Sequence, residues 1–128
     1  FGLDKTIEIL YNARAEALRL EDENTVAVFS IVCREFGLTI HQMLSGRGRK
    51  NDRVMAIGLC VYFLKNEFQY APSDISSALR RDRSICWRYC KKVLELDEKN
   101  IADIKILEIK GRCNTEVGKF KMGKIEVH

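Results

Sequence analysis

The residues of this sequence that could do chemistry are concentrated in one basic segment. Residues 80–96 read RRDRSICWRYCKKVLEL, in which arginines and lysines alternate with apolar residues. On a helix over residues 83–96, helical spacing places these residues on one face: Arg83, Ser84, Trp87, Arg88 and Lys91. The opposite face is apolar and consists of Cys86, Tyr89, Cys90, Val93 and Leu96. One side of this helix therefore suits a protein core, and the other suits a negatively charged partner.

A helix of this kind can enter the major groove of double-stranded DNA. The groove admits one α-helix, and an arginine can donate two parallel hydrogen bonds to guanine. We expect the residues at the start of the helix to contact bases: Arg83, Ser84 and Ile85. Four further residues are predicted to bind phosphates: Arg80, Arg81, Arg88 and Lys91. The alternative is a surface helix with solvated basic side chains, in which Trp87 packs on the N-terminal helix.

A second basic segment lies upstream, at residues 46–53. It is polar and contains Gly46 and Gly48, so we expect a loop rather than a helix. Its cations are predicted to follow a phosphate backbone or to reach into a minor groove: Arg47, Arg49, Lys50 and Arg53. The segment lacks the G-x-x-x-x-G-K-[ST] pattern, and no βαβ pattern surrounds it, so no nucleotide site is predicted.

The charge of the chain supports a polyanionic partner. The 128 residues carry a net charge of +4. Residues 41–92 hold eleven Lys and Arg against four Asp and Glu, a balance of +7, whereas residues 1–40 balance at −3 and residues 93–128 at zero. Concentrated positive charge is the electrostatic footprint of a nucleic-acid-binding surface, although a solvated basic face would give the same count.

Other kinds of chemistry are not indicated. Five cysteines form an odd set, mostly within apolar helical patterns, and we interpret them as reduced thiols of a cytoplasmic protein. Cys86 and Cys90 lie four residues apart, but no second pair completes a zinc site, so no metal or other cofactor is expected. No catalytic triad, H-E-x-x-H motif or matched carboxylate pair is present. The sequence predicts a binding protein and not an enzyme.

The elements that must position the basic residues are helices. Apolar spacing predicts helices over residues 3–20, 26–36 and 53–68, the last apolar on most of its faces and therefore central. Asn24 or Thr25 is expected to cap the second helix, Gly37 to end it, and Thr39 to cap a short turn. Ser73 is the expected cap of a helix that ends near residue 79, and Asp82 that of the basic helix.

Two short helices joined by a link of three to four residues have the outline of a helix-turn-helix. The tail is open to two interpretations: a continued helix, or a β-hairpin formed by residues 104–110 and 119–127. We therefore divide the chain into an N-terminal helix and linker (1–24), a helix-turn-helix domain (25–98) and a tail (99–128). No run of apolar residues is long enough to span a membrane.

Residues 25–96 resemble the C-terminal DNA-binding domain of the bacterial chromosomal replication initiator DnaA. The resemblance is carried by MLSGRGRKNDRVMAIGL and ISSALRRDRSICWRYCKKVLEL, with Arg53, Met55-Ala56, Ala78-Leu79, Arg81-Asp82 and Ser84 on the family's pattern. It implies a Trp-repressor-like, mostly α-helical fold, with bases read at Arg83, Ser84 and Ile85 and the minor groove reached by Arg53 and a neighbouring loop cation. It does not extend to the family's ATPase domain, so we expect a relative that shares one domain.

This sequence departs from the family at several informative positions. Arg80 stands where the family has Gly, Arg83 where it has His, Ile85 where it has Thr, and Cys86 where it has Val. Because two of these are base-reading positions, we expect a DNA target that differs from the family's replication-origin box. The competing function is a protein-interaction module that kept the scaffold without binding DNA, with the N-terminal helix or the tail as its contact surface.

Overall fold

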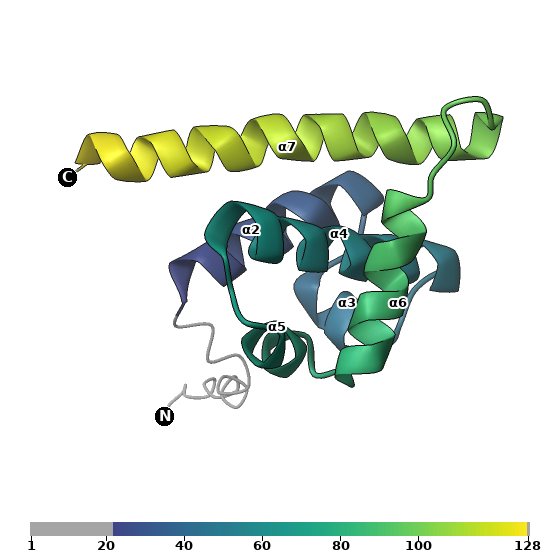
Figure 1. Cartoon of the computed structure of the whole chain (residues 1–128), viewed down its shortest axis with the longest axis horizontal. Helices are drawn as coiled ribbons and strands as arrows, with labels where there is room; N and C mark the ends of the chain where they lie inside the picture. Colours follow the sequence, from purple (N-terminus) through teal and green to yellow (C-terminus); the bar gives the residue numbers. More distant parts are fainter. Residues whose placement is uncertain (1–21, 128) are drawn as a thin grey trace.

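The computed structural model describes the backbone of residues 22–127 and the side chains of residues 22–123. This part of the chain is mostly helical and contains no strand. Its helices, labelled as in Figure 1, are α2 (Glu23–Phe36), α3 (Ile40–Ser45), α4 (Lys50–Phe68), α5 (Pro72–Leu79), α6 (Arg83–Leu94) and α7 (Ile101–Val127). The prediction of a mostly α-helical fold is confirmed. The helix expected over residues 3–20 lies outside the described residues.

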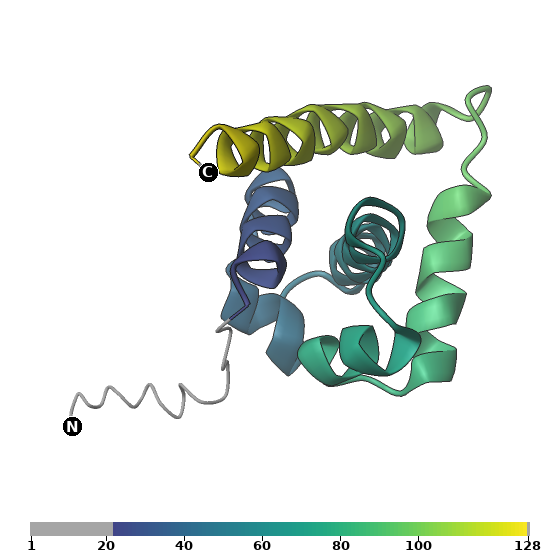
Figure 2. The ribbon, with the colours of Figure 1, turned by 60° about the vertical axis from the view of Figure 1, so that its left-hand side comes forward.

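Helix α4 lies at the centre of the fold. Nine of its 19 residues are buried, as expected for a helix that is apolar on most faces. Figure 2 looks nearly along α4 and shows the other helices arranged around it. The closest approach is at Gly58, where an added Cβ would run into the Tyr89 carbonyl oxygen and lie 2.8 Å from Val93 Cγ2. Only glycine permits this separation of α4 and α6.

The ends of two early helices follow the predicted signals. Gly37 ends α2 in the left-handed conformation, with φ of 67°. Thr39 caps α3 through a capping box, because its hydroxyl accepts a hydrogen bond from the Gln42 amide while the Gln42 side chain accepts one from the Thr39 amide. These two caps turn the chain sharply between α2 and α3 and bring α3 back against α2.

Two other predicted caps are wrong. Asp22 caps α2, rather than Asn24 or Thr25, and its carboxylate accepts hydrogen bonds from the Asn24 amide at 3.1 Å and the Thr25 hydroxyl at 2.9 Å. Helix α5 begins at Pro72, so Ser73 lies inside its first turn. Proline suits the first helical position because its φ is already helical and the missing N–H would have had no partner there.

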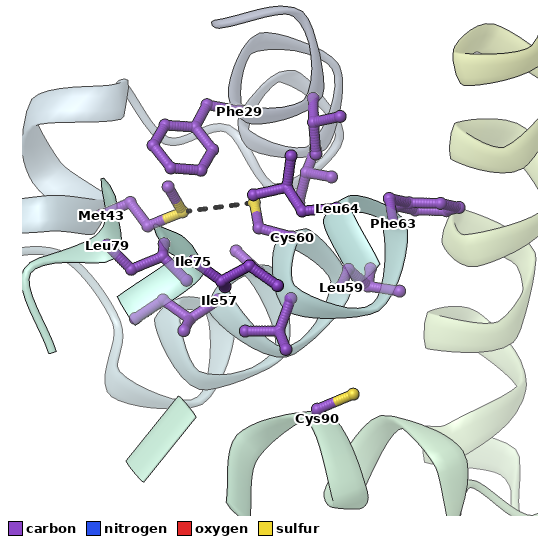
Figure 3. Packing of buried hydrophobic residues seen from close by; sticks show 14 of the residues in the cluster. Phe29, Met43, Ile57, Leu59, Cys60, Phe63, Leu64, Ile75, Leu79 and Cys90 are labelled. Carbon is purple, nitrogen blue, oxygen red and sulfur yellow. Dashed lines mark hydrogen bonds between the residues drawn. The ribbon is translucent and has the colours of Figure 1, made fainter. Parts of the chain in front are cut away.

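The core gathers around the side chains of α4. Figure 3 shows Phe29 of α2, Met43 of α3, and Ile75 and Leu79 of α5 converging on Ile57, Cys60 and Leu64. The Met43 thioether lies 3.6 Å from the Cys33 sulfur and 3.9 Å from the Cys60 sulfur. Cys90 approaches from α6, while Phe63 points toward α7. A single core therefore holds α2–α6 together, and the flexible methionine fills the space between the two thiols.

The tail is one long helix and not a β-hairpin. Helix α7 packs across α2 and α4, with Cys113 and Val117 buried and Phe120 against Phe68, at 6.3 Å between ring centroids. Two ion pairs fasten it: Arg112 to Glu35 of α2 at 2.9 Å, and Lys121 to Glu67 of α4 at 3.2 Å. The alternation that favoured strands is overridden because burial recurs at helical spacing, at residues 113, 117 and 120.

None of the described helices combines the length and the apolar composition that a membrane span requires.

Candidate nucleic-acid interface

Helix α6 is divided into an exposed basic face and a buried apolar face, as predicted. Five residues share the exposed face: Arg83, Ser84, Trp87, Arg88 and Lys91. Cys86, Cys90 and Val93 are buried on the other side, and Ile85 is half-buried at the border. The helix ends at Leu94, two residues earlier than expected. Helix α7 packs on α2 and α4 and does not run along α6 (Figure 2).

Asp82 fixes the start of α6. Its Oδ1 accepts hydrogen bonds from the Ser84 amide and the Ser84 hydroxyl, each at 2.8 Å. The hydrogen bond from the Ser84 amide, then that from the hydroxyl, and the nearby charges of Arg83 and Arg88 hold the pKa of Asp82 below its ordinary value. The predicted cap is confirmed. Because its proton is donated to Asp82, the Ser84 hydroxyl is left to accept a hydrogen bond from a partner.

Trp87 stands half exposed, with 50% of its surface accessible. Among the described residues it contacts Lys65 of α4, whose ammonium lies 4.3 Å from the ring centroid in a cation–π interaction. Trp87 also lines a small, mostly apolar cavity of about 60 Å³, together with Val61, Lys65, Pro72, Ile75, Arg83 and Cys86. The sequence did not indicate Lys65, because the contact joins two helices. The N-terminal helix proposed to cover Trp87 lies outside the described residues.

The guanidinium of Arg81 is hydrogen-bonded within the fold. Its two terminal nitrogens donate hydrogen bonds to four main-chain oxygens, of Met43 at 3.1 Å, Leu44 at 3.0 Å, Leu79 at 3.2 Å and Arg80 at 3.5 Å. These bonds fasten the end of α3 to the turn between α5 and α6. The guanidinium is thus engaged within the fold, and the phosphate contact expected of Arg81 stays a prediction. Its neighbour Arg80 is exposed and has a φ of 57°, in the left-handed region.

The basic loop is shorter than predicted. Helix α4 begins at Lys50, so the segment between the helices is residues 46–49, and Lys50 and Arg53 lie on α4. Arg47 and Arg49 are exposed in the loop, whereas Arg53 is half-buried and its Nε donates a hydrogen bond to the Gly48 carbonyl at 3.3 Å. Asp52 in the first turn favours a helix start there. Arg53 thus stabilises the conformation of the loop through this hydrogen bond.

A groove runs between the start of α4 and the second half of α6. It has a volume of about 520 Å³, and three cations stand along it: Lys50, Arg88 and Lys92. The rest of its lining is Asn51, Val54, Met55 and Tyr89. The groove joins the end of the basic loop to the basic helix. Lys92 was not among the residues predicted from the sequence, although its position four residues after Arg88 places both on one flank of a helix.

No protein-family model matches this chain, and no curated protein or solved structure is significantly similar to it. The interpretation of the interface therefore depends on its own geometry, charge and exposure.

The cysteines are packing groups in this fold. All five are buried and unbonded to one another. Burial raises the pKa of the Cys33 and Cys113 thiols to about 12, so both are protonated at neutral pH and are poor nucleophiles. Among the described residues, no group of three or more His, Cys, Asp and Glu side chains could hold a metal ion.

Proposed function

We propose that this chain binds double-stranded DNA through a helix-turn-helix formed by α5 and α6, on a Trp-repressor-like scaffold. The observation that carries the proposal is the basic face of α6, which is exposed along the helix while the opposite face is buried in the core. A three-residue turn, Arg80–Asp82, separates the two helices, a length typical of this motif. A recognition helix needs such a free face, because it must lie within the major groove.

In this proposal the side chains divide between bases and backbone. Arg83 and Ser84 project from the first turn of α6, where recognition helices contact base edges. Ile85, beside them, offers an apolar contact to a thymine methyl group. The backbone is bound by cations that flank the helix or precede α4, and these are Arg47, Arg49, Arg80, Arg88 and Lys91. Arg81 and Arg53 act indirectly, by holding the turn and the loop in shape.

We also propose that the chain is a relative of the DNA-binding domain of the replication initiator DnaA. One feature supports the resemblance beyond the sequence pattern. The position where that family carries Gly, and this chain carries Arg80, takes a φ of 57°, a conformation that glycine adopts at no steric cost. The residues at the base-reading positions differ, so the proposed target differs too.

The proposed role is binding without catalysis, in the cytoplasm. Five buried free thiols fit a reducing compartment, where cysteine serves as a small apolar residue. The basic face of α6 carries no acid–base pair suited to group transfer, since its one carboxylate neighbour, Asp82, is engaged in capping.

Titration of a labelled duplex at several salt concentrations tests the proposal. Each phosphate that the protein neutralises releases about 0.9 counterion, so the affinity should fall steeply as salt rises. Selection of bound duplexes from a random pool would then define the preferred sequence. Absence of binding at low salt, or an affinity that does not change with salt, would contradict the proposal.

A protein-interaction module is the second candidate, and exposed apolar side chains favour it. Ile101 at the start of α7 is 83% exposed and Met122 near its end is 57% exposed, while Leu94 at the end of α6 is 52% exposed. Ile101 and Met122 lie on α7, whereas Leu94 lies at the end of α6 on the side of Trp87 and Lys91. The second candidate becomes the better one if duplex DNA fails to bind. In that case, replacement of Ile101 and Met122 by Ser should weaken binding of the protein partner to the exposed surface of α7.

A further inference from the structure

We infer that the groove between α4 and α6 binds backbone phosphates of one DNA strand, so that Lys50, Arg88 and Lys92 form one phosphate-binding site. The inference depends on the DNA binding proposed above and adds to it the path of the backbone beside α6. It also assigns a DNA contact to Lys92. Lys50, which was expected to act from the loop, is assigned to this site instead.

The first support is that the three cations are not engaged in ion pairs or hydrogen bonds among the described residues. In the part of the chain that the structure describes, the side chains of Lys50, Arg88 and Lys92 make no ion pair or hydrogen bond. Other basic residues differ: Lys91 lies 4.0 Å from Glu95, and Arg112 is paired with Glu35. Unpaired cations that face each other repel, and this repulsion is relieved when an anion lies between them.

The second support is the composition and size of the groove. Its lining contains no acidic side chain among the described residues. Its volume of about 520 Å³ falls within the range of about 300–1,000 Å³ that is usual for small-ligand sites. Val54, Met55 and the ring of Tyr89 add apolar surface to the lining, which suits the sugar between two phosphates.

The third support is the position of the groove relative to α6. Arg88 and Lys92 lie one helical turn apart on the flank of α6 that faces α4, beside the face that carries Arg83 and Ser84. A helix in the major groove is bordered by the two phosphate backbones. One DNA backbone would therefore pass along this flank of α6. Lys50 would bind it at the start of α4, next to Arg49 of the loop.

A triple variant tests the inference: Lys50→Gln, Arg88→Gln and Lys92→Gln together. The matched control removes one arginine and two lysines elsewhere, with Arg34→Gln, Lys105→Gln and Lys119→Gln, all at exposed positions. Binding of the selected duplex is measured against salt concentration. We expect the groove variant to reduce the slope of log affinity against log salt by about 2–3, because three phosphate contacts at about 0.9 counterion each are lost. The control should keep the wild-type slope, and both variants should keep the wild-type sequence preference.

A second measurement locates the phosphates. Duplexes that carry a neutral methylphosphonate at one backbone position at a time are titrated against both the wild type and the groove variant. One or two adjacent positions should weaken wild-type binding and leave binding of the groove variant unchanged. If the wild type binds DNA but the groove variant behaves like the control, the inference is wrong while the proposed function stands. If the wild type does not bind duplex DNA, both are wrong.

Discussion

The two faces of helix α6 differ in what determines their residues. On the buried face the packing is close: a Cβ added at Gly58 of α4 would run into the Tyr89 carbonyl oxygen and lie 2.8 Å from Val93 Cγ2. On the exposed face, Arg83 and Arg88 make no hydrogen bond or ion pair within the described chain. The comparison teaches that one side of this helix is determined by packing within the fold, whereas the charges of the other side are exposed and are the ones proposed above to contact DNA.

The same contrast appears between two consecutive arginines. Arg81 donates hydrogen bonds to carbonyl oxygens of α3 and α5, while Arg80 is exposed in a left-handed conformation. Sequence alone makes them equivalent, as both were expected to bind phosphate. Their different environments assign one to stability and one to the surface.

The largest expected effect separates these two arginines. Arg81→Ala should lower the free energy of unfolding by about 2–3 kcal/mol, since hydrogen bonds to a charged group are lost and main-chain oxygens of Met43 and Leu44 lose their partner. Arg80→Ala is the matched control and should change stability by less than about 0.5 kcal/mol. Urea denaturation measures both. Equal losses in the two variants would remove the distinction between them.

The next effect concerns the exposed face. Arg83→Ala should reduce discrimination between the preferred duplex and other sequences by about 1–3 kcal/mol, because a base-reading contact is lost. Lys91→Ala should weaken binding to all sequences about equally, as expected for a phosphate contact. Competition titrations with preferred and scrambled duplexes measure the difference. An unchanged preference in Arg83→Ala would show that this residue does not read bases.

A smaller effect tests the buried face. Gly58→Ala should lower the free energy of unfolding by about 1–2 kcal/mol, because overpacking against the Tyr89 backbone outweighs the better helix propensity of alanine. Gly111→Ala in α7 has open space around the added methyl group and should instead raise stability by about 0.5–1 kcal/mol. Thermal and urea unfolding of both variants compare the same substitution in two environments, and a stabilised Gly58→Ala would contradict the close packing of α4 and α6.

The smallest effect joins the two faces, at the N-cap of α6. The pKa of Asp82 is lowered, so its contribution to stability is complete above the ordinary pKa of an unfolded aspartate and is lost as pH falls through the lower folded-state value. Below that pH the Ser84 amide and hydroxyl lose an ionised acceptor. NMR titration of the carboxyl group, with Asp82→Asn as control, should show a midpoint below the ordinary value of 3.8. A midpoint above it would contradict the cap geometry.

Much of the fold could be predicted because local signals and tertiary packing agree. The helical spacing of Phe29, Val32 and Cys33 indicated α2, and the apolar composition of α4 indicated a central helix. The caps expected at Thr39 and Asp82 are also present. The errors arose where two local signals competed. At Pro72–Ser73 the fixed φ of proline prevailed over the capping side chain, and at residues 46–53 the acidic first turn of α4 prevailed over the polar, glycine-containing pattern.

The candidate site could be predicted only in part. The exposed face of α6 follows from helical periodicity, which is a property of one segment. The internal hydrogen bonds of Arg81 and the contact between Lys65 and Trp87 join residues from different helices, so no periodicity within one segment could indicate them. The tail was ambiguous for the same reason, since the packing of Cys113 and Phe120 on the domain decides between helix and strand.

Helix α4 also sets a distance. It starts at the basic loop and passes beside α6 from Lys92 to Trp87, and its 19 residues form a rod of about 28 Å at the usual rise per residue. Arg81 also fastens the end of α3, just before the loop, to the turn before α6, so packed helices hold the loop arginines at a fixed separation from the first turn of α6. In the proposed DNA complex, one base pair inserted between the segments that contact the loop and α6 would rotate one of them by about a tenth of a helical turn. A scaffold that holds the loop and α6 at a fixed separation would bind such a duplex more weakly.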